Sequence, residues 1–307
     1  MSVIRRHRWL QAAILLGPAA VWALAFIVVP TVLAVCMGFW KMRDFRLVKE
    51  WNLDNYSTFL NGDIYWRGLL NALENGAMAA ALAVALSVPL AHFIRFRVRR
   101  HKTLFIGAVV VALWLGYLLR VFGWRVLFGA NGVLNTFLID IGLTEEPLSF
   151  LIFSRFAIVL TQTQLAMPFA FIPIYAALER VQPSLLQAAG DLGAPRWRQL
   201  VNVELPLIAP ALVIGATFSF ILAFGDYFAT SFVGPPSASQ TIGNQVADNF
   251  RATINWPMGA ALGTVMMLTI LLVLSLPALM TRLWRPAARR RGGRPPATDK
   301  LDEGAIA

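Results

Sequence analysis

Residues 179–206 read ERVQPSLLQAAGDLGAPRWRQLVNVELP, a polar stretch that separates two long apolar runs. The stretch is too polar and too interrupted by proline and glycine for a bilayer-spanning helix. We predict instead two short helices. Pro183 suits the first turn of one helix, Gly193 can end that helix in a left-handed conformation, and Pro195 begins the other. Pro206 is expected to close the second helix where the next apolar run begins.

Both short helices have an apolar face. Ser184 and Gln187 have the spacing of a capping box at the start of the first helix. The apolar residues share one face of each helix, Leu185, Ala188, Ala189 and Leu192 on the first and Trp197, Leu200 and Val201 on the second. Such a face needs a cover, either a groove on another protein or the membrane surface. A plain amphipathic loop lying on the membrane is the alternative without a partner.

The rest of the 307-residue chain is strongly apolar. Hydrophobic residues make up 58% of the sequence and charged residues 14%, and the mean hydropathy is +0.63. A soluble domain has roughly 45–50% apolar and about 25% charged residues, so these values exclude a typical soluble enzyme, a coiled coil and a disordered chain. The apolar runs predict an all-α membrane protein with six transmembrane helices. They lie at 10–39, 68–94, 103–122, 153–178, 207–231 and 257–281.

The basic residues predict the orientation of these spans. The formal net charge is +11, which in a soluble protein would suggest nucleic acid. Here Lys and Arg flank the spans, so we expect the lipid bilayer as their partner and no nucleic acid. Eighteen of them lie on the side of both termini and of residues 179–206, and six lie on the opposite side. The positive-inside rule therefore places both termini in the cytoplasm.

The 179–206 stretch resembles the EAA motif of the permease subunits of bacterial ATP-binding-cassette (ABC) importers. That motif is Glu-Ala-Ala, three residues, Gly, nine residues and Ile-x-Leu-Pro. This chain has Gln187-Ala188-Ala189, Gly193 and Val203-x-Leu205-Pro206 at the same spacing. The resemblance runs from about Leu53 through the sixth span. Three segments are similar to the spermidine/putrescine branch: Leu118–Trp124 (LLRVFGW), Ile242-Gly243-Asn244 and Asn255-Trp256-Pro257.

The resemblance implies the fold and the partners of a type I ABC importer transmembrane domain. The first short helix would be the coupling helix, which docks into a groove on a separate ABC ATPase subunit. An extracytoplasmic solute-binding protein would deliver the solute, and a second permease subunit, a homologue rather than an identical copy, would complete the path. The implied location is the bacterial inner membrane, which the chain crosses several times. The implied ATPase-coupling residues are Gln187, Ala188, Ala189, Asp191, Gly193, Leu205 and Pro206.

One coupling position departs from the family pattern. Gln187 stands where the family has its leading Glu, which keeps hydrogen bonding and removes the charge. An ion pair to the ATPase is therefore not expected at this position, although docking is. The resemblance divides the chain into three parts, an anchor helix and first outer loop (1–59), a permease core that includes the coupling loop (60–281) and a basic disordered tail (282–307).

The sequence lacks the motifs that this chain would need for catalysis. It has no G-x-x-x-x-G-K-[ST] phosphate loop and no G-x-S-x-G nucleophile motif. His7, His92 and His101 show no metal-ligand spacing, and the single cysteine, Cys36, cannot form a disulfide within the chain. We therefore expect a transport subunit and not an enzyme, with no cofactor of its own. ATP and Mg would be bound by the partner ATPase.

Charged side chains within apolar spans are candidates for the solute path, because each costs about 2.5–3.5 kcal/mol on insertion scales. Asp226 is the clearest of them, and Tyr227 and Phe224 beside it would offer cation–π contacts to a polyamine. In the alternative reading Asp226 pairs with Arg120, near the end of the third span. Glu74, early in the second span, is expected to reach the outer surface.

Two other functions compete with the importer subunit. A secondary transporter that works alone would have several paired ionisable residues within the spans or an inverted repeat, and neither is evident. A membrane scaffold without transport would leave residues 179–206 unexplained. An ABC permease for another small cationic or amino compound also remains open, because one acidic position discriminates weakly between such solutes.

Overall fold

The computed structural model describes residues 8–98, 100–235 and 240–289. The chain divides into two units, residues 1–268 and 269–307. The second unit, as far as it is described, continues the helix α15 (Trp256–Arg289). Helices make up almost all of the first unit, as the apolar runs predicted, and the paragraphs below concern that unit.

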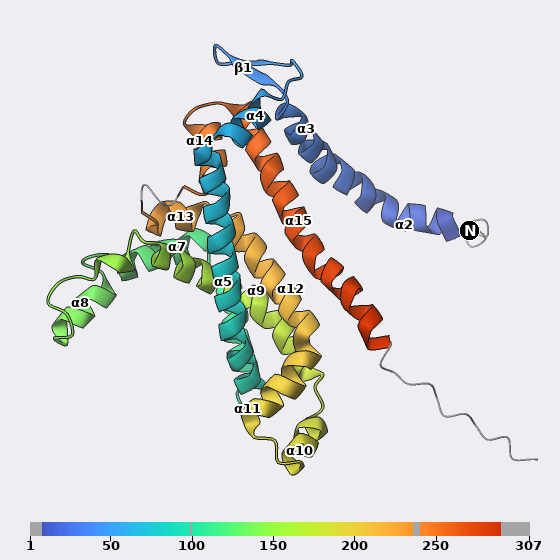
Figure 1. Cartoon of the computed structure of the whole chain (residues 1–307), viewed down its shortest axis with the longest axis vertical. Coiled ribbons are helices and arrows are strands. Elements are labelled where there is room, and N and C mark those ends of the chain that lie inside the picture. The colour runs from blue at the N-terminus through green and yellow to red at the C-terminus, as the bar shows by residue number, and fades with distance from the viewer. Residues whose placement is uncertain (1–7, 99, 236–239, 290–307) are drawn as a thin grey trace, which may run out of the picture. The chain divides into compact units, whose positions relative to one another are not determined.

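Three helices pack against one another at the centre of the first unit: α5 (Asp63–Phe96), α9 (Arg155–Glu179) and α12 (Leu205–Phe224) (Figure 1). Small residues line their contacts, because van der Waals packing between spans improves when backbones approach closely. Ala79, Ala83 and Ala91 of α5 are fully buried. Gly215 of α12 lies so close to α9 that an added Cβ would stand 3.1 Å from the Ala170 Cα.

The N-terminal segment is one apolar helical stretch. It comprises α2 (Arg8–Ala23), a π-helical turn (Leu24–Val28) and α3 (Val29–Met37). The candidate span within it, Leu16–Met37, is not buried by the rest of the chain at all. A long apolar helix without neighbours in its own chain is stable only where lipid or another membrane subunit surrounds it.

A small β-hairpin follows this first span, which the all-α prediction missed. Strands β1 (Lys41–Arg43) and β2 (Arg46–Val48) pair antiparallel, and Arg43 stands opposite Arg46. Asp44 and Phe45 form the turn with φ of 48° and 59°, the geometry that two-residue hairpin turns require. Each strand has only three residues, which is too short for the alternation of apolar and polar residues that indicates a strand in a sequence. Helix α4 (Asp54–Asn61) follows the hairpin.

The third predicted span, at 103–122, is interrupted in the structure. Helix α6 (Lys102–Trp114) is followed by Leu115 and Gly116. The extended backbone of these two residues separates α6 from α7 (Tyr117–Phe128). Helix α8 (Val133–Asp140) follows, and the axis bends by 98° at the break. The described residues therefore contain five helices long and apolar enough to cross a membrane, or six if the bent pair counts as one span.

The fifth span also differs from its prediction of 207–231. It begins earlier, because α11 (Arg196–Gln199) runs through a π-helical turn (Leu200–Glu204) directly into α12. Pro206 therefore does not close a helix. The wider π turn, in which the Leu205 amide bonds the Leu200 carbonyl, takes up the strain that a proline causes within an α-helix. The span ends earlier as well, at Phe224.

The remaining elements are short helices around this core and the C-terminal helix. Helix α13 (Phe228–Val233) packs with α7 against α9, and α14 (Ile242–Arg251) packs against α5. A 3-10 turn (Ser149–Leu151) precedes α9. Helix α15 covers residues 282–289 of the predicted disordered tail, so that part of the prediction is wrong. Residues 290–307 lie outside the described residues.

The contact of α12 with α9 gives a stability prediction. Gly215→Val would push a side chain against the Ala170 backbone, and overpacking of this kind costs about 1–3 kcal/mol. Gly107→Val in α6 is the matched control, because nothing lies within 4 Å of an added Cβ there. We expect Gly215→Val to lower the thermal unfolding temperature in detergent by several degrees relative to Gly107→Val. Equal temperatures for the two variants would contradict the close approach.

Candidate functional site

The loop between α9 and α12 contains the predicted first short helix, α10 (Pro183–Asp191). Its end confirms the prediction for Gly193, which has φ of +81°. The Ala194 amide donates to the Ala189 carbonyl at 2.9 Å, and the Gly193 amide to the Gly190 carbonyl at 2.8 Å. These two bonds are those of a Schellman motif, in which the left-handed residue is usually glycine.

The predicted capping box at the start of α10 is absent. The helix begins two residues earlier than that pattern requires, with Gln182 at the N-cap and no side-chain hydrogen bond there. Ser184 consequently lies in the first turn, where its hydroxyl is not in the capping position. Gln187 is exposed on the helix and free to contact another protein.

Apolar side chains on this loop are exposed to an unusual degree. Leu192 is 89% exposed, Trp197 61% and Leu185 46%. Ala188 and Asp191 are exposed beside them, so α10 and its end bring Gln187, Ala188, Ala189, Asp191 and Gly193 together on one accessible element. Leu205 and Pro206 lie apart from them, beyond the π turn at the start of α12.

Two side-chain contacts that sequence reasoning missed tie this loop to the helical core. His92 Nδ1 of α5 lies 2.8 Å from Oε2 of Glu204, whose side chain is 1% exposed. Glu179, at the end of α9, accepts a 2.5 Å hydrogen bond from Lys102 Nζ and lies 3.7 Å from Arg95. Long-range pairing of this kind has no signal in the spacing of a single sequence. Both ends of the loop are thereby fixed to the three-helix core.

Asp226 lies in the break between α12 and α13, and both oxygens of its carboxylate accept hydrogen bonds. Oδ1 accepts hydrogen bonds from the backbone amides of Phe228 and Ala229, at 3.0 and 3.2 Å, and so caps α13. Tyr117 donates its hydroxyl to the same oxygen, and Gln162 Nε2 donates to Oδ2 at 3.1 Å. The sequence analysis missed Tyr117 and Gln162. The amide side chain of Gln162, in the middle of an apolar span, was the available signal.

Arg120 shares a small cavity with Asp226 but does not form an ion pair with it among the described residues. The cavity measures about 120 Å³, and Tyr117 and Gln162 also line it. The Nε and Nη1 atoms of Arg120 are buried without a hydrogen-bond partner in the described part of the chain. A carboxylate and a guanidinium with two unpaired nitrogens therefore line the same cavity.

The other two predicted path residues lie outside this cavity. Phe224 is completely buried and stacks on Phe220, with ring centroids 5.5 Å apart. The Arg251 guanidinium lies over the Tyr227 ring, 5.5 Å from the ring centroid. Glu74 pairs with Arg155, whose Nε also donates to Asn75 at 2.9 Å. Within residues 8–98, 100–235 and 240–289, no group of three His, Cys, Asp or Glu side chains is placed to hold a metal ion.

Three comparisons with known proteins agree on the kind of protein. The family described as "Binding-protein-dependent transport system inner membrane component" matches residues 18–286. The spermidine/putrescine transport system permease protein PotB of Haemophilus influenzae is 28% identical over 257 residues, 82% of this chain and 88% of PotB. The inner membrane ABC transporter permease protein YdcU of Escherichia coli is 34% identical over 257 residues, 78% of this chain and 79% of YdcU.

A solved structure has the same fold. It is a bacterial alginate ABC transporter in complex with an alginate pentasaccharide-bound periplasmic protein. One of its chains matches with a TM-score of 0.73 and 20% identity, over 92% of this chain and 96% of that chain.

Proposed function

Because the chain belongs to the family of binding-protein-dependent transport system inner membrane components, we propose that it carries a polyamine such as spermidine or putrescine across the bacterial inner membrane. The chain is an ABC importer permease, a transport component and not an enzyme, and a multi-pass membrane protein. The similarity to PotB over most of both chains is the observation that supports the polyamine. This membership argues against a secondary transporter that works alone.

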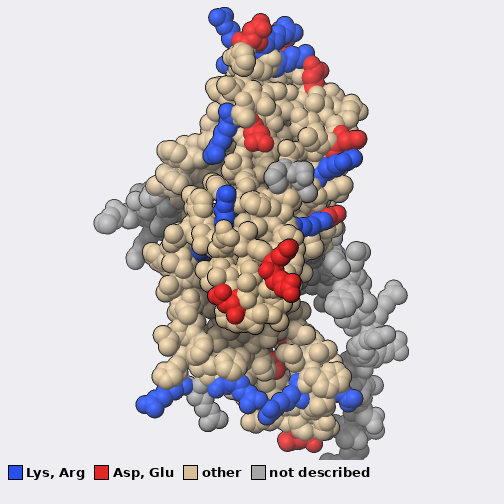
Figure 2. Space-filling view, turned by 90° about the vertical axis from the view of Figure 1, so that its left-hand side faces the viewer, with Lys and Arg blue, Asp and Glu red and all other residues tan. Residues whose placement is uncertain are grey.

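The proposed topology has six spans, with both termini and residues 179–206 in the cytoplasm. The bent pair α6–α7 supplies the sixth span. Figure 2 supports the orientation, because Lys and Arg form a row at the end of the molecule that carries α10 and α11 in Figure 1. Arg95, Arg97, Arg180 and Arg196 belong to that end by their positions at helix termini.

In this proposal α10 is the coupling helix and the 179–206 stretch is the EAA motif. The exposed Leu185, Leu192 and Trp197 give it an apolar surface that an ABC ATPase subunit would cover. That subunit would bind ATP and Mg. A homologous second permease would complete the path, and an extracytoplasmic solute-binding protein would deliver the solute, as a periplasmic protein binds the related alginate transporter.

The continuous helix from Arg196 to Phe224 provides a mechanical link in this proposal. Its first turns follow the coupling helix, and its last residue lies two positions before Asp226. A shift of α10 caused by the ATPase would therefore move the wall of the Asp226 cavity. The π turn at Leu200–Glu204 is a suitable hinge, since such turns often mark functional sites in helices.

One observation favours a second candidate solute. Arg120 would repel a polyamine in the cavity that it shares with Asp226, whereas an amino compound with an acceptor group would satisfy both side chains. A small cationic or amino compound other than a polyamine is therefore the alternative. The ligand retained by the cognate binding protein distinguishes the two.

The substitution Asp226→Asn tests whether the charge of the Asp226 carboxylate binds the solute. The variant keeps an oxygen that can accept from the amides of Phe228 and Ala229 and from the Tyr117 hydroxyl, and Gln162 keeps its hydrogen bond to the Ala223 carbonyl. The protein should therefore fold. If the charge binds the solute, uptake of radiolabelled spermidine should fall about tenfold or more, since a charged hydrogen bond contributes roughly 1.5–3 kcal/mol.

Glu74→Gln is the matched control, because it removes a carboxylate from α5 at an exposed position. We expect it to keep most of its uptake. Full uptake by Asp226→Asn at normal protein abundance would end the solute-contact proposal.

The coupling role is testable by Gly193→Ala. A left-handed conformation costs a residue other than glycine about 1–2 kcal/mol, and nothing lies within 4 Å of the added Cβ, so the effect acts through the backbone alone. We expect the end of α10 to rearrange and uptake and ATPase association to fall severalfold. Gly190→Ala adds the same methyl group within the helix, where it meets only the end of the flexible Gln199 side chain at 3.3 Å, and should retain both activities. Equal uptake by the two variants would remove the coupling assignment.

A further inference from the structure

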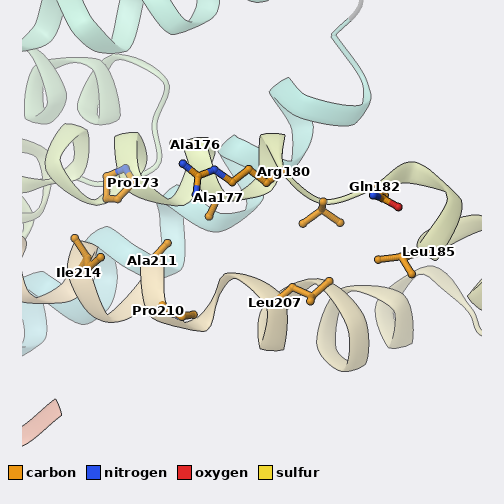
Figure 3. Close-up of a pocket in the computed structure, with 11 residues that line it drawn as sticks. Pro173, Ala176, Ala177, Arg180, Gln182, Leu185, Leu207, Pro210, Ala211 and Ile214 are labelled. Atoms are coloured by element: carbon orange, nitrogen blue, oxygen red, sulfur yellow. The ribbon is translucent and has the colours of Figure 1, made fainter. Parts of the chain in front are cut away.

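A groove of about 610 Å³ lies between α9 and α12, beside the first turn of α10 (Figure 3). Its walls are almost entirely apolar. Pro173, Ala176 and Ala177 contribute from α9, and Leu207, Pro210, Ala211 and Ile214 contribute from α12. Gln182 and Leu185 close the end of the groove that lies next to the coupling helix.

Arg180 is the one charged residue that lines the groove in the described part of the chain. Its guanidinium makes no ion pair or hydrogen bond with any described residue. The neighbouring carboxylate of Glu179 pairs with Lys102 and Arg95 through its Oε1 atom and not with Arg180. An unpaired cation thus stands at the mouth of an apolar groove, at the end of a membrane-spanning helix.

An apolar groove with a single cation favours a ligand that has an anionic head and an apolar tail. Basic pockets between transmembrane helices on the cytoplasmic side bind the head groups of anionic lipids. An acyl chain in the groove would make van der Waals contacts with its apolar walls. The lipid phosphate would accept a charge-assisted hydrogen bond from Arg180. A polyamine is disfavoured here, because the groove presents a cation and no carboxylate.

We propose that the groove between α9 and α12 binds an anionic phospholipid, with the phosphate on Arg180 and an acyl chain along the apolar walls. The site is independent of the Asp226 cavity, which different residues line. The lipid would contact the first turn of α10 at Gln182 and Leu185. Lipid composition would therefore act on the loop that carries the exposed apolar side chains.

The test measures lipid retained by the full chain, purified with its importer subunits in nanodiscs that contain phosphatidylcholine and phosphatidylglycerol. Native mass spectrometry would count the bound phosphatidylglycerol. We expect Arg180→Gln to lose at least severalfold of it and Arg180→Lys to keep part of it. Ala176→Trp, which fills the groove without a change of charge, should displace the lipid as well.

Arg97→Gln is the matched control, since Arg97 also ends a helix at the same end of the molecule and does not line the groove. It should retain as much phosphatidylglycerol as the unchanged chain. Equal loss in Arg97→Gln and Arg180→Gln would overturn the site, because the lipid would then respond to net charge alone. Unchanged binding in Ala176→Trp, or a helix of the second permease seated in the groove of the assembled importer, would overturn it too.

Discussion

The carboxylate of Asp226 joins the two places where helices are interrupted within the candidate spans. Backbone amides without partners are costly in a bilayer, so a helix can break there only where other groups satisfy them. Asp226 caps α13 after the break at Gly225, and it accepts the hydroxyl of Tyr117, the first residue after the break at Gly116. Gln162 of α9 completes the set. One side chain therefore holds three helices around the cavity.

The loop at the other end of α12 depends on the same helix. Residues 196–224 form one continuous element, so the position of the exposed α10 and the position of Asp226 are mechanically connected. The close contact of Gly215 with Ala170 and the pair of Glu204 with His92 fix this element against α9 and α5. In the proposed function this connection would let an ATPase bound at α10 act on the Asp226 cavity.

Local signals predicted local structure well. The apolar runs located most of the spans, and Gly193 and Pro183 located the end and the start of α10, because each residue has an intrinsic backbone preference. The 98° break at Leu115–Gly116 was not predictable, since neither residue excludes a helix and the partners of the break lie far away in sequence. The same holds for Tyr117, Gln162 and the His92–Glu204 pair, which only the packed helices bring together.

The central claim is that the exposed face of α10 docks on an ABC ATPase. Disulfide cross-linking in native membranes tests it most directly, with Ala188→Cys in a Cys36→Ser background and cysteines introduced along the groove of the ATPase. A cross-linked species with the combined mass of the two chains is the expected result. Phe45→Cys at the tip of the hairpin, where Phe45 is 80% exposed, should give no such species. Cross-linking from Phe45→Cys and none from Ala188→Cys would contradict the account.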